Sequence, residues 1–147
     1  MAQAIHWFDF SQFYKEVNRI LKPGGIIAII GYGLFKSNEE TNDFINHFYR
    51  NIVGPYWDPE RRYLDDGYLS IPFPFEEFKA PDLEMEFSWD FEHLIGYLKT
   101  WSAVKHFQNK NAYDPVVLIS KDLRTAFGER GVVKFPLFLR LGQKISN

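Results

Sequence analysis

The 147-residue sequence contains no cysteine, and this absence excludes several chemistries at once. No disulfide can form, no thiolate can hold a metal ion, and no thiol is available as a nucleophile. Long apolar runs are also missing, as is the basic stretch followed by an apolar core that starts a signal peptide. We therefore expect a cytoplasmic protein that does not associate with membranes.

An excess of positive charge is equally absent. Lysine and arginine total 17 against 19 aspartates and glutamates, which gives a formal net charge of -2. Such a chain has no electrostatic basis for binding nucleic acid. The histidines at 47, 93 and 106 have no metal-ligand spacing, and no Gly-x-Ser-x-Gly motif occurs. We therefore predict neither a metal site nor a hydrolase of the nucleophile-elbow type.

Aromatic residues, by contrast, are abundant. They make up 18% of the chain, and hydrophobic residues in total make up 46%, which is enough to bury a core. We expect one domain over residues 1–147. Prolines and aromatics are densest over 55–81, where no regular periodicity is visible, so this segment is interpreted as an ordered insertion that serves as a substrate lid.

The clearest local signals lie near the N-terminus. Asp9 is a suitable N-cap for a helix, and Phe8 and Phe13 have the spacing of a hydrophobic staple. Residues 22–25, Lys-Pro-Gly-Gly, predict the end of that helix and a turn. The aliphatic run over 26–30 then predicts a strand that is buried on both faces, as in a parallel sheet covered by helices.

The remaining predicted elements are a helix over 37–54, a strand over 83–89, helices over 91–101 and 114–127, and a strand over 132–141. Ser37 and Glu40 have the spacing of a capping box, and Asp114 precedes a proline in the manner of an N-cap. Pro136 falls inside the last strand, where a missing N–H favours a bulge.

The helix, the turn over 22–25 and the aliphatic strand that follows resemble the helix before the fifth strand, the turn and the fifth strand of class I S-adenosylmethionine-dependent methyltransferases. Residues 2–9, with His6 and Trp7, are similar to the segment after the fourth strand in small-molecule methyltransferases of the trans-aconitate type. Residues 100–103 resemble part of the helix after the sixth strand. The resemblance implies an α/β fold with part of a Rossmann-like sheet, namely strands five, six and seven with flanking helices, in a mixed parallel and antiparallel arrangement.

The family's glycine-rich cofactor turn has no counterpart here. Gly31 and Gly33 follow a strand, but Lys36 stands where a third glycine would be, so they predict a turn that opens the pocket. The resemblance therefore implies a truncated C-terminal portion that is inactive alone, with S-adenosylmethionine bound only in the intact enzyme. An unpaired fifth strand would also favour a homo-oligomer, through the exposed sheet edge or swapped elements.

The resemblance implies a site at the end of the sheet. The catalytic candidate is His6, which would orient a small-molecule substrate or act as a base; the alternative is a partly exposed polar residue. Cofactor contacts are expected from Ala2, Gln3, Ala4 and Trp7, and substrate contacts from Tyr32, Trp57, Tyr63, Tyr97 and Trp101. Core packing remains the alternative for Trp101. A non-catalytic split subunit and a fragment of a nucleotide-cofactor dehydrogenase remain alternative functions.

Overall fold

The computed structural model describes residues 1–145, which divide into two compact units. Unit 1 comprises Met1–Leu34, Glu60–Met85 and the described part of Phe135–Asn147, and unit 2 comprises Phe35–Pro59 and Glu86–Lys134. Compact units of one chain can belong to a single domain, so the expectation of one domain stays a prediction.

A four-stranded sheet confirms the α/β class. In unit 1, β1 (Ile26–Tyr32) pairs antiparallel with β4 (Arg130–Gln143), and β4 also pairs antiparallel with β2 (Glu76–Phe78). The strand order is β1-β4-β2, and β3 (Leu83–Asp90) also pairs with β4. The mixed sheet expected from the resemblance is not confirmed, because the parallel pairing recorded within residues 1–145 is an isolated bridge between Ala2 and Ile30.

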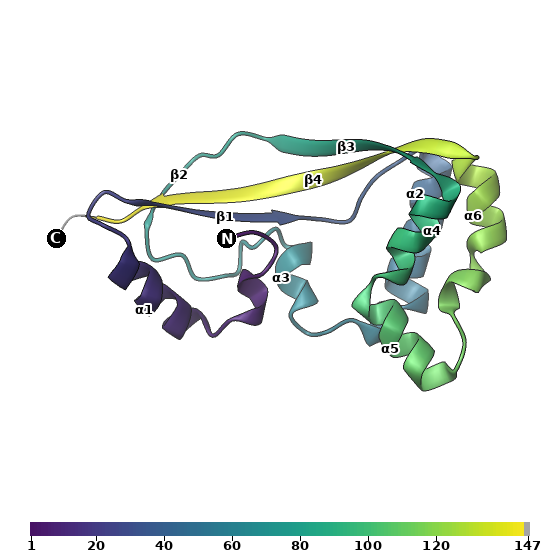
Figure 1. Ribbon diagram of the computed structural model, residues 1–147, viewed down its shortest axis with the longest axis horizontal. Helices are drawn as coiled ribbons and strands as arrows, with labels where there is room; N and C mark the ends of the chain where they lie inside the picture. Colours follow the sequence, from purple (N-terminus) through teal and green to yellow (C-terminus); the bar gives the residue numbers. More distant parts are fainter. Residues whose placement is uncertain (146–147) are drawn as a thin grey trace. The chain divides into compact units, whose positions relative to one another are not determined.

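The expectation that β1 is buried on both faces is wrong. Ile27 and Ile29 are buried, whereas Ile26 is 58% exposed and Ile30 is 37% exposed. Side chains alternate between the two faces of a strand, so one face of β1 carries the buried residues and the other is open. Figure 1 shows why, because α1 (Phe10–Ile20) and α3 (Arg61–Asp65) of unit 1 lie on the same side of β1.

The first helix agrees closely with its prediction. Helix α1 covers Phe10–Ile20, and the carboxylate of Asp9 accepts a hydrogen bond from the backbone N–H of Gln12 at 3.0 Å. The rings of Phe8 and Phe13 stack with their centroids 5.6 Å apart, as a hydrophobic staple requires. Both signals are local in sequence, which is why they could be predicted without knowledge of the tertiary structure.

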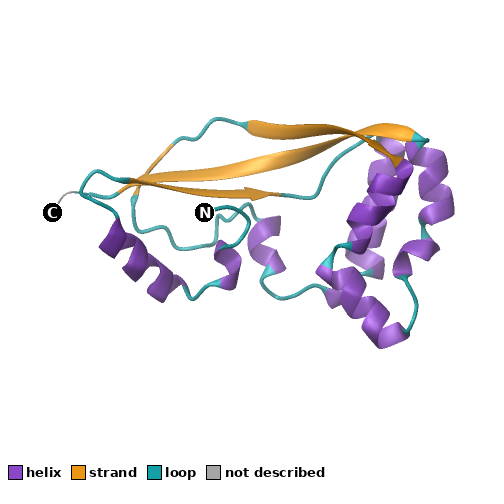
Figure 2. Cartoon of the chain, viewed as in Figure 1, coloured by secondary structure: helices purple, strands orange, loops and turns teal. Residues whose placement is uncertain are grey.

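Unit 2 is built mainly of helices (Figure 2). They are α2 (Glu39–His47), the π-helical turn η2 (Phe48–Ile52), the 3-10 turns η3 (Gly54–Tyr56) and η4 (Pro115–Leu118), α4 (Phe91–Lys99), α5 (Ser102–Asn111) and α6 (Ser120–Phe127). Both α2 and α4 pack against α6. Each of these three helices contributes a buried aliphatic side chain, namely Ile45, Leu94 and Leu123.

Several helix boundaries in unit 2 differ from the predictions. The cap of α2 is Asn38, whose side chain accepts from Thr41 N at 2.8 Å, while Ser37 donates from its hydroxyl to the carbonyl of Val132. Residues 100–103 do not lie within one helix, because Trp101 has an extended backbone and separates α4 from α5. Asp114 does act as a cap, but it begins the short turn η4.

Strand β4 passes through Pro136 without interruption. Its ladder with β1 runs from Gln143, opposite Ile26, to Leu137, opposite Tyr32. Pro136 comes next, where its carbonyl accepts from the N–H of Gly33 at 3.0 Å and it has no N–H to return the bond. The missing N–H of Pro136 therefore does not interrupt the ladder with β1, because the proline lies where that ladder ends. Strand β4 is also longer than the predicted strand over 132–141.

Candidate functional site

The N-terminal residues lie along the C-terminal half of β1. The N–H of Ile30 donates to the carbonyl of Met1, and the N–H of Gln3 donates to the carbonyl of Ile30, both at 2.8 Å. Gln3 has a left-handed backbone with φ of 48°, and its side-chain amide bonds both the N–H and the carbonyl of Tyr32. These bonds fix the N-terminal residues near the C-terminal end of β1.

The next residues form the 3-10 turn η1 (Ile5–Trp7), which separates a buried histidine from an exposed tryptophan. The turn is closed by the N–H of Trp7, which donates to the carbonyl of Ala4 at 3.1 Å. Within it, His6 is 5% exposed and Trp7 is 57% exposed. Trp7 is therefore not a core residue, and His6 is more deeply buried than the polar surface alternative assumed.

A tyrosine from a distant part of the chain contacts this histidine. Nδ1 of His6 lies 2.9 Å from the hydroxyl oxygen of Tyr68, which is fully buried. Among the described residues the structure records no partner for His6 Nε2. This atom is not completely buried. One ring nitrogen is thus held by Tyr68, and the other has no recorded hydrogen-bond partner among the described residues.

The end of α3 places Tyr68 in this position. The N–H of Tyr68 donates to the carbonyl of Tyr63 at 2.7 Å, and the N–H of Gly67 donates to the carbonyl of Leu64, which together form a Schellman motif. Gly67 has a φ of 65° and Tyr68 a φ of 66°. A left-handed backbone is unfavourable for a tyrosine by about 1–3 kcal/mol, so surrounding contacts must hold it there.

Arg140 on β4 provides such contacts. Its guanidinium donates to the carbonyl oxygens of Tyr68 and Ile71 at 2.9 and 2.7 Å, and it forms a two-pronged pair with the carboxylate of Glu77. Only 12% of the Arg140 side chain is exposed. This largely covered side chain therefore connects the loop that carries Tyr68 to the sheet.

Burial sets the protonation of both groups in the pair. Burial, with a further contribution from the positive charge of Arg61, lowers the pKa of His6 below its usual value of 6.5. Burial also raises the pKa of Tyr68 to about 12. The imidazole and the phenol are therefore both predominantly neutral at pH 7, and the pair is mainly one hydrogen bond between uncharged groups.

The structure brings together only some of the predicted substrate residues. Tyr32 and Tyr63 lie in unit 1 with His6, where Tyr32 packs against Phe135 and Tyr63 against Phe10. The others lie in unit 2, in an aromatic cluster of Tyr49, Trp57, Tyr97 and Trp101. Trp101 is 7% exposed and packs in that core, which agrees with the alternative noted for it. No substrate role is tested by this placement.

Gly31 lies within β1, where a turn was predicted, and Gly33 follows the strand; neither glycine leaves open space for a cofactor. A Cβ added to Gly31 would lie 2.0 Å from the ring of Phe138, and a Cβ on Gly33 would lie 3.3 Å from Pro136. Protein side chains therefore fill the space that these glycines leave. The polar groups of Gln3 are likewise engaged with β1. The described residues do not fit a complete S-adenosylmethionine site, and they offer at most part of its border.

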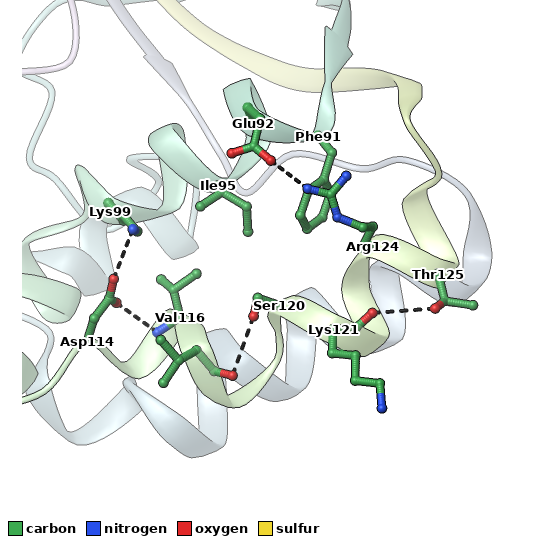
Figure 3. Close-up of a pocket in the computed structure, with 11 residues that line it drawn as sticks. Phe91, Glu92, Ile95, Lys99, Asp114, Val116, Ser120, Lys121, Arg124 and Thr125 are labelled. Carbon is green, nitrogen blue, oxygen red and sulfur yellow. Dashed lines mark hydrogen bonds and ion pairs between the residues drawn. The ribbon is translucent and has the colours of Figure 1, made fainter.

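Unit 2 contains a cavity of about 520 Å³ between α4, η4 and α6 (Figure 3). At one end Arg124 pairs with Glu92, and at the other Lys99 pairs with Asp114 at 3.2 Å. Figure 3 also shows Lys121 pointing away from these pairs. The charged groups that face this cavity already bond one another, so a ligand would have to displace them. We therefore place the candidate site at His6.

Sequence reasoning missed Tyr68 and Arg140. Tyr68 lies 62 residues from His6 in the chain, and no periodicity connects the two. One local signal was present, because Gly67 follows a short helical stretch and a glycine after a helix predicts a C-terminal cap. That signal could have identified the turn at Tyr68 but not its contact with His6.

The fold and this site define an α/β protein with a buried histidine–tyrosine pair at the end of a sheet strand. No family model matches the chain. It is 32% identical over 153 residues to a Dictyostelium discoideum protein provisionally named as a methyltransferase. Its structure is similar, with a TM-score of 0.90 and 36% identity, to an Anaeromyxobacter dehalogenans protein provisionally named as a type II methyltransferase. In sequence and in structure, the chain is therefore similar to part of these methyltransferases.

The extent of these matches is uneven. They cover 98% of this chain but 58% of the Dictyostelium protein, and 99% of this chain but 63% of the Anaeromyxobacter protein.

Among residues 1–145, no helix has the length and apolar character needed to span a bilayer. In the same residues, no group of three or more potential metal ligands lies together.

Proposed function

We propose that this chain forms the acceptor-binding side of an S-adenosylmethionine-dependent methyltransferase that acts on a small molecule. One observation carries the proposal: His6 is buried, held through Nδ1 by Tyr68, and has no recorded partner among the described residues for Nε2, which is not completely buried. A buried imidazole with one free nitrogen is suited to binding a polar group of a ligand. The similarity to proteins provisionally named as methyltransferases suggests the reaction class.

Within this proposal the cofactor is held mainly by residues outside this chain. The sequence contains no glycine-rich cofactor turn, and packing against Phe138 and Pro136 occupies the space beside Gly31 and Gly33. When bound, S-adenosylmethionine would supply an electrophilic methyl group. This chain would align the acceptor and exclude water, and Trp7 would present its exposed ring to the pocket.

A chimera provides the test. The segment of the Dictyostelium relative that matches this chain is replaced by this chain, and calorimetry measures S-adenosylmethionine binding by the chimera and by the chain alone. A radiolabelled methyl group on the cofactor then reports transfer into a panel of small acids, phenols and amines. We expect the chimera to bind the cofactor and to label a small molecule, and the chain alone to do neither.

His6→Gln in the chimera should preserve cofactor binding and lower methyl transfer about 100-fold, the usual effect of removing a catalytic hydrogen-bonding group. His93→Gln, an exposed histidine in unit 2, is the matched control and should have no effect. If the chain alone binds the cofactor, the proposal that residues outside this chain hold most of the cofactor would be wrong. A chimera that binds the cofactor but methylates nothing would instead support a non-catalytic subunit.

A further inference from the structure

We propose that Tyr68 is a positioning residue that sets the tautomer of His6. Its hydroxyl donates to Nδ1, so the neutral imidazole carries its proton on Nε2 and faces the ligand as a hydrogen-bond donor. This inference rests on the proposed function of the same site. It assigns His6 a different role from that of a proton acceptor, and it assigns a role to Tyr68, which the sequence did not single out.

The direction of the hydrogen bond follows from the chemistry of the two groups. A phenol O–H is a more acidic donor than a neutral imidazole N–H, and the unprotonated ring nitrogen is a stronger acceptor than a phenol oxygen. The 2.9 Å separation is an ordinary hydrogen-bond distance. Tyr68 is fully buried, and His6 is the partner that the structure records for its hydroxyl. Donation to Nδ1 therefore satisfies both groups.

The surroundings keep both members of the pair in the required state. Burial lowers the pKa of His6 and raises that of Tyr68, so the neutral form of each group predominates at neutral pH. The charged residues that act on His6 are Arg61, which opposes its protonation, and Glu60, which favours it less strongly. Arg61 is itself paired with Asp65 at 3.5 Å.

The backbone supports a specific placement of the hydroxyl. Tyr68 has a left-handed φ of 66°, its carbonyl is held by Arg140, and its ring packs edge-on against Phe138 with centroids 5.0 Å apart. An unfavourable backbone that is held from several sides is typical of residues placed for function. The strain is retained where it aims a phenol at the one buried histidine of the described chain.

This tautomer restricts the acceptor. An imidazole that already carries a proton on Nε2 cannot remove a proton from the acceptor through that atom. His6 would instead donate to a lone pair on the ligand. The site then suits a methyl-accepting substrate whose reacting atom already has a free lone pair, so that no proton has to pass to His6. The same substrate would accept a hydrogen bond from the N–H at Nε2.

Nitrogen NMR of the imidazole side chains tests the inference on the 147-residue chain without cofactor. Long-range ¹H–¹⁵N spectra are recorded at a pH well above 6.5, and His6→Gln identifies the His6 signals. We expect Nδ1 of His6 to have the shift of an unprotonated nitrogen and Nε2 that of a protonated one. A protonated Nδ1 would mean that His6 donates to Tyr68, and the proposal would be wrong.

Tyr68→Phe is the matching variant, because it removes the hydroxyl and keeps the ring. It should bring the two His6 nitrogen shifts closer together and raise the pKa of His6, while the exposed His47 and His93 stay unchanged as internal references. Unchanged His6 shifts and pKa would also overturn the proposal. If the variant does not fold, the spectrum of the unsubstituted chain still decides the tautomer.

The NMR result is independent of the chimera experiment. A chimera without methyl transfer together with a protonated Nε2 would reject the proposed function and keep the positioning role of Tyr68. Methyl transfer together with a protonated Nδ1 would keep the proposed function and reject the positioning role of Tyr68.

Discussion

Individual residues at the site show how burial determines their chemistry. His6 and Tyr68 are both polar and both nearly or fully buried, and each satisfies the other. Leaving either group without its partner would leave a buried polar atom unsatisfied, which is unfavourable by about 1–3 kcal/mol. The hydrogen bond that positions His6 at the candidate site therefore also contributes to the stability of the fold.

The pH dependence of stability should report on His6. Its pKa in the folded protein lies below 6.5, so between these two values the unfolded chain binds more protons than the folded one. The contribution of His6 to the free energy of unfolding is fully present above pH 6.5 and is lost as the pH falls through the folded-state pKa. The slope is at most about 1.4 kcal/mol per pH unit.

Urea unfolding over this pH range measures the effect. The difference in the free energy of unfolding between the original chain and His6→Gln should change with pH as described above. His93→Gln should have the same pH dependence of stability as the original chain. A pH-independent difference between the original chain and His6→Gln would contradict the lowered pKa.

Two buried tyrosines provide a matched comparison. The hydroxyl of Tyr14 is buried without a hydrogen-bond partner among the described residues, whereas that of Tyr68 bonds His6. Tyr14→Phe should therefore be neutral or stabilising, and Tyr68→Phe should destabilise by about 1 kcal/mol. Urea unfolding measures both values, and equal losses of stability would refute the assigned difference in bonding.

At the scale of elements, α1 depends on its cap. Asp9→Ala removes the acceptor for Gln12 N and should lower the free energy of unfolding by about 1 kcal/mol. Asp9→Asn keeps a side-chain oxygen and is the control. Chemical denaturation of both variants measures the effect, and an Asn variant as unstable as the Ala variant would argue against the cap.

The segment that carries Tyr68 depends on Arg140. Arg140→Lys keeps the charge but cannot form both the fork to Glu77 and the bonds to the carbonyls of Tyr68 and Ile71. We expect a loss of about 2 kcal/mol in the free energy of unfolding. Arg130→Lys changes an exposed arginine on the same strand and should have little effect. Similar unfolding curves for the two variants would contradict this role.

At the scale of the whole molecule, we propose that the chain forms a homo-oligomer through the open face and edge of β1. Residues 1–3 cover the C-terminal half of the edge, but Ile26 remains 58% exposed. We expect a concentration-dependent dimer by size-exclusion chromatography with light scattering. Ile26→Lys should shift it toward monomer, and Ile20→Lys, which alters an exposed isoleucine on α1, should not. A monomer at every concentration would reject the proposal.

The sequence by itself determined the elements whose signals are local. Asp9, Phe8 and Phe13 lie within one turn of the helix start, so their contacts form as soon as the helix does. The aliphatic run of β1 likewise favours an extended chain. Its burial could not be predicted, because exposure depends on which strands and helices cover each face.

The tertiary structure alone decided the site. The bond between His6 and Tyr68 closes a loop of 62 residues, and Arg140 reaches Tyr68 across 72. Such contacts depend on strand pairing and on the position of Tyr68 relative to His6. Gly67 is a local signal for the turn at Tyr68, but no neighbouring residue encodes these distant contacts. Residue type indicated that His6 could carry chemistry, and the fold decided which nitrogen is held and which one remains free.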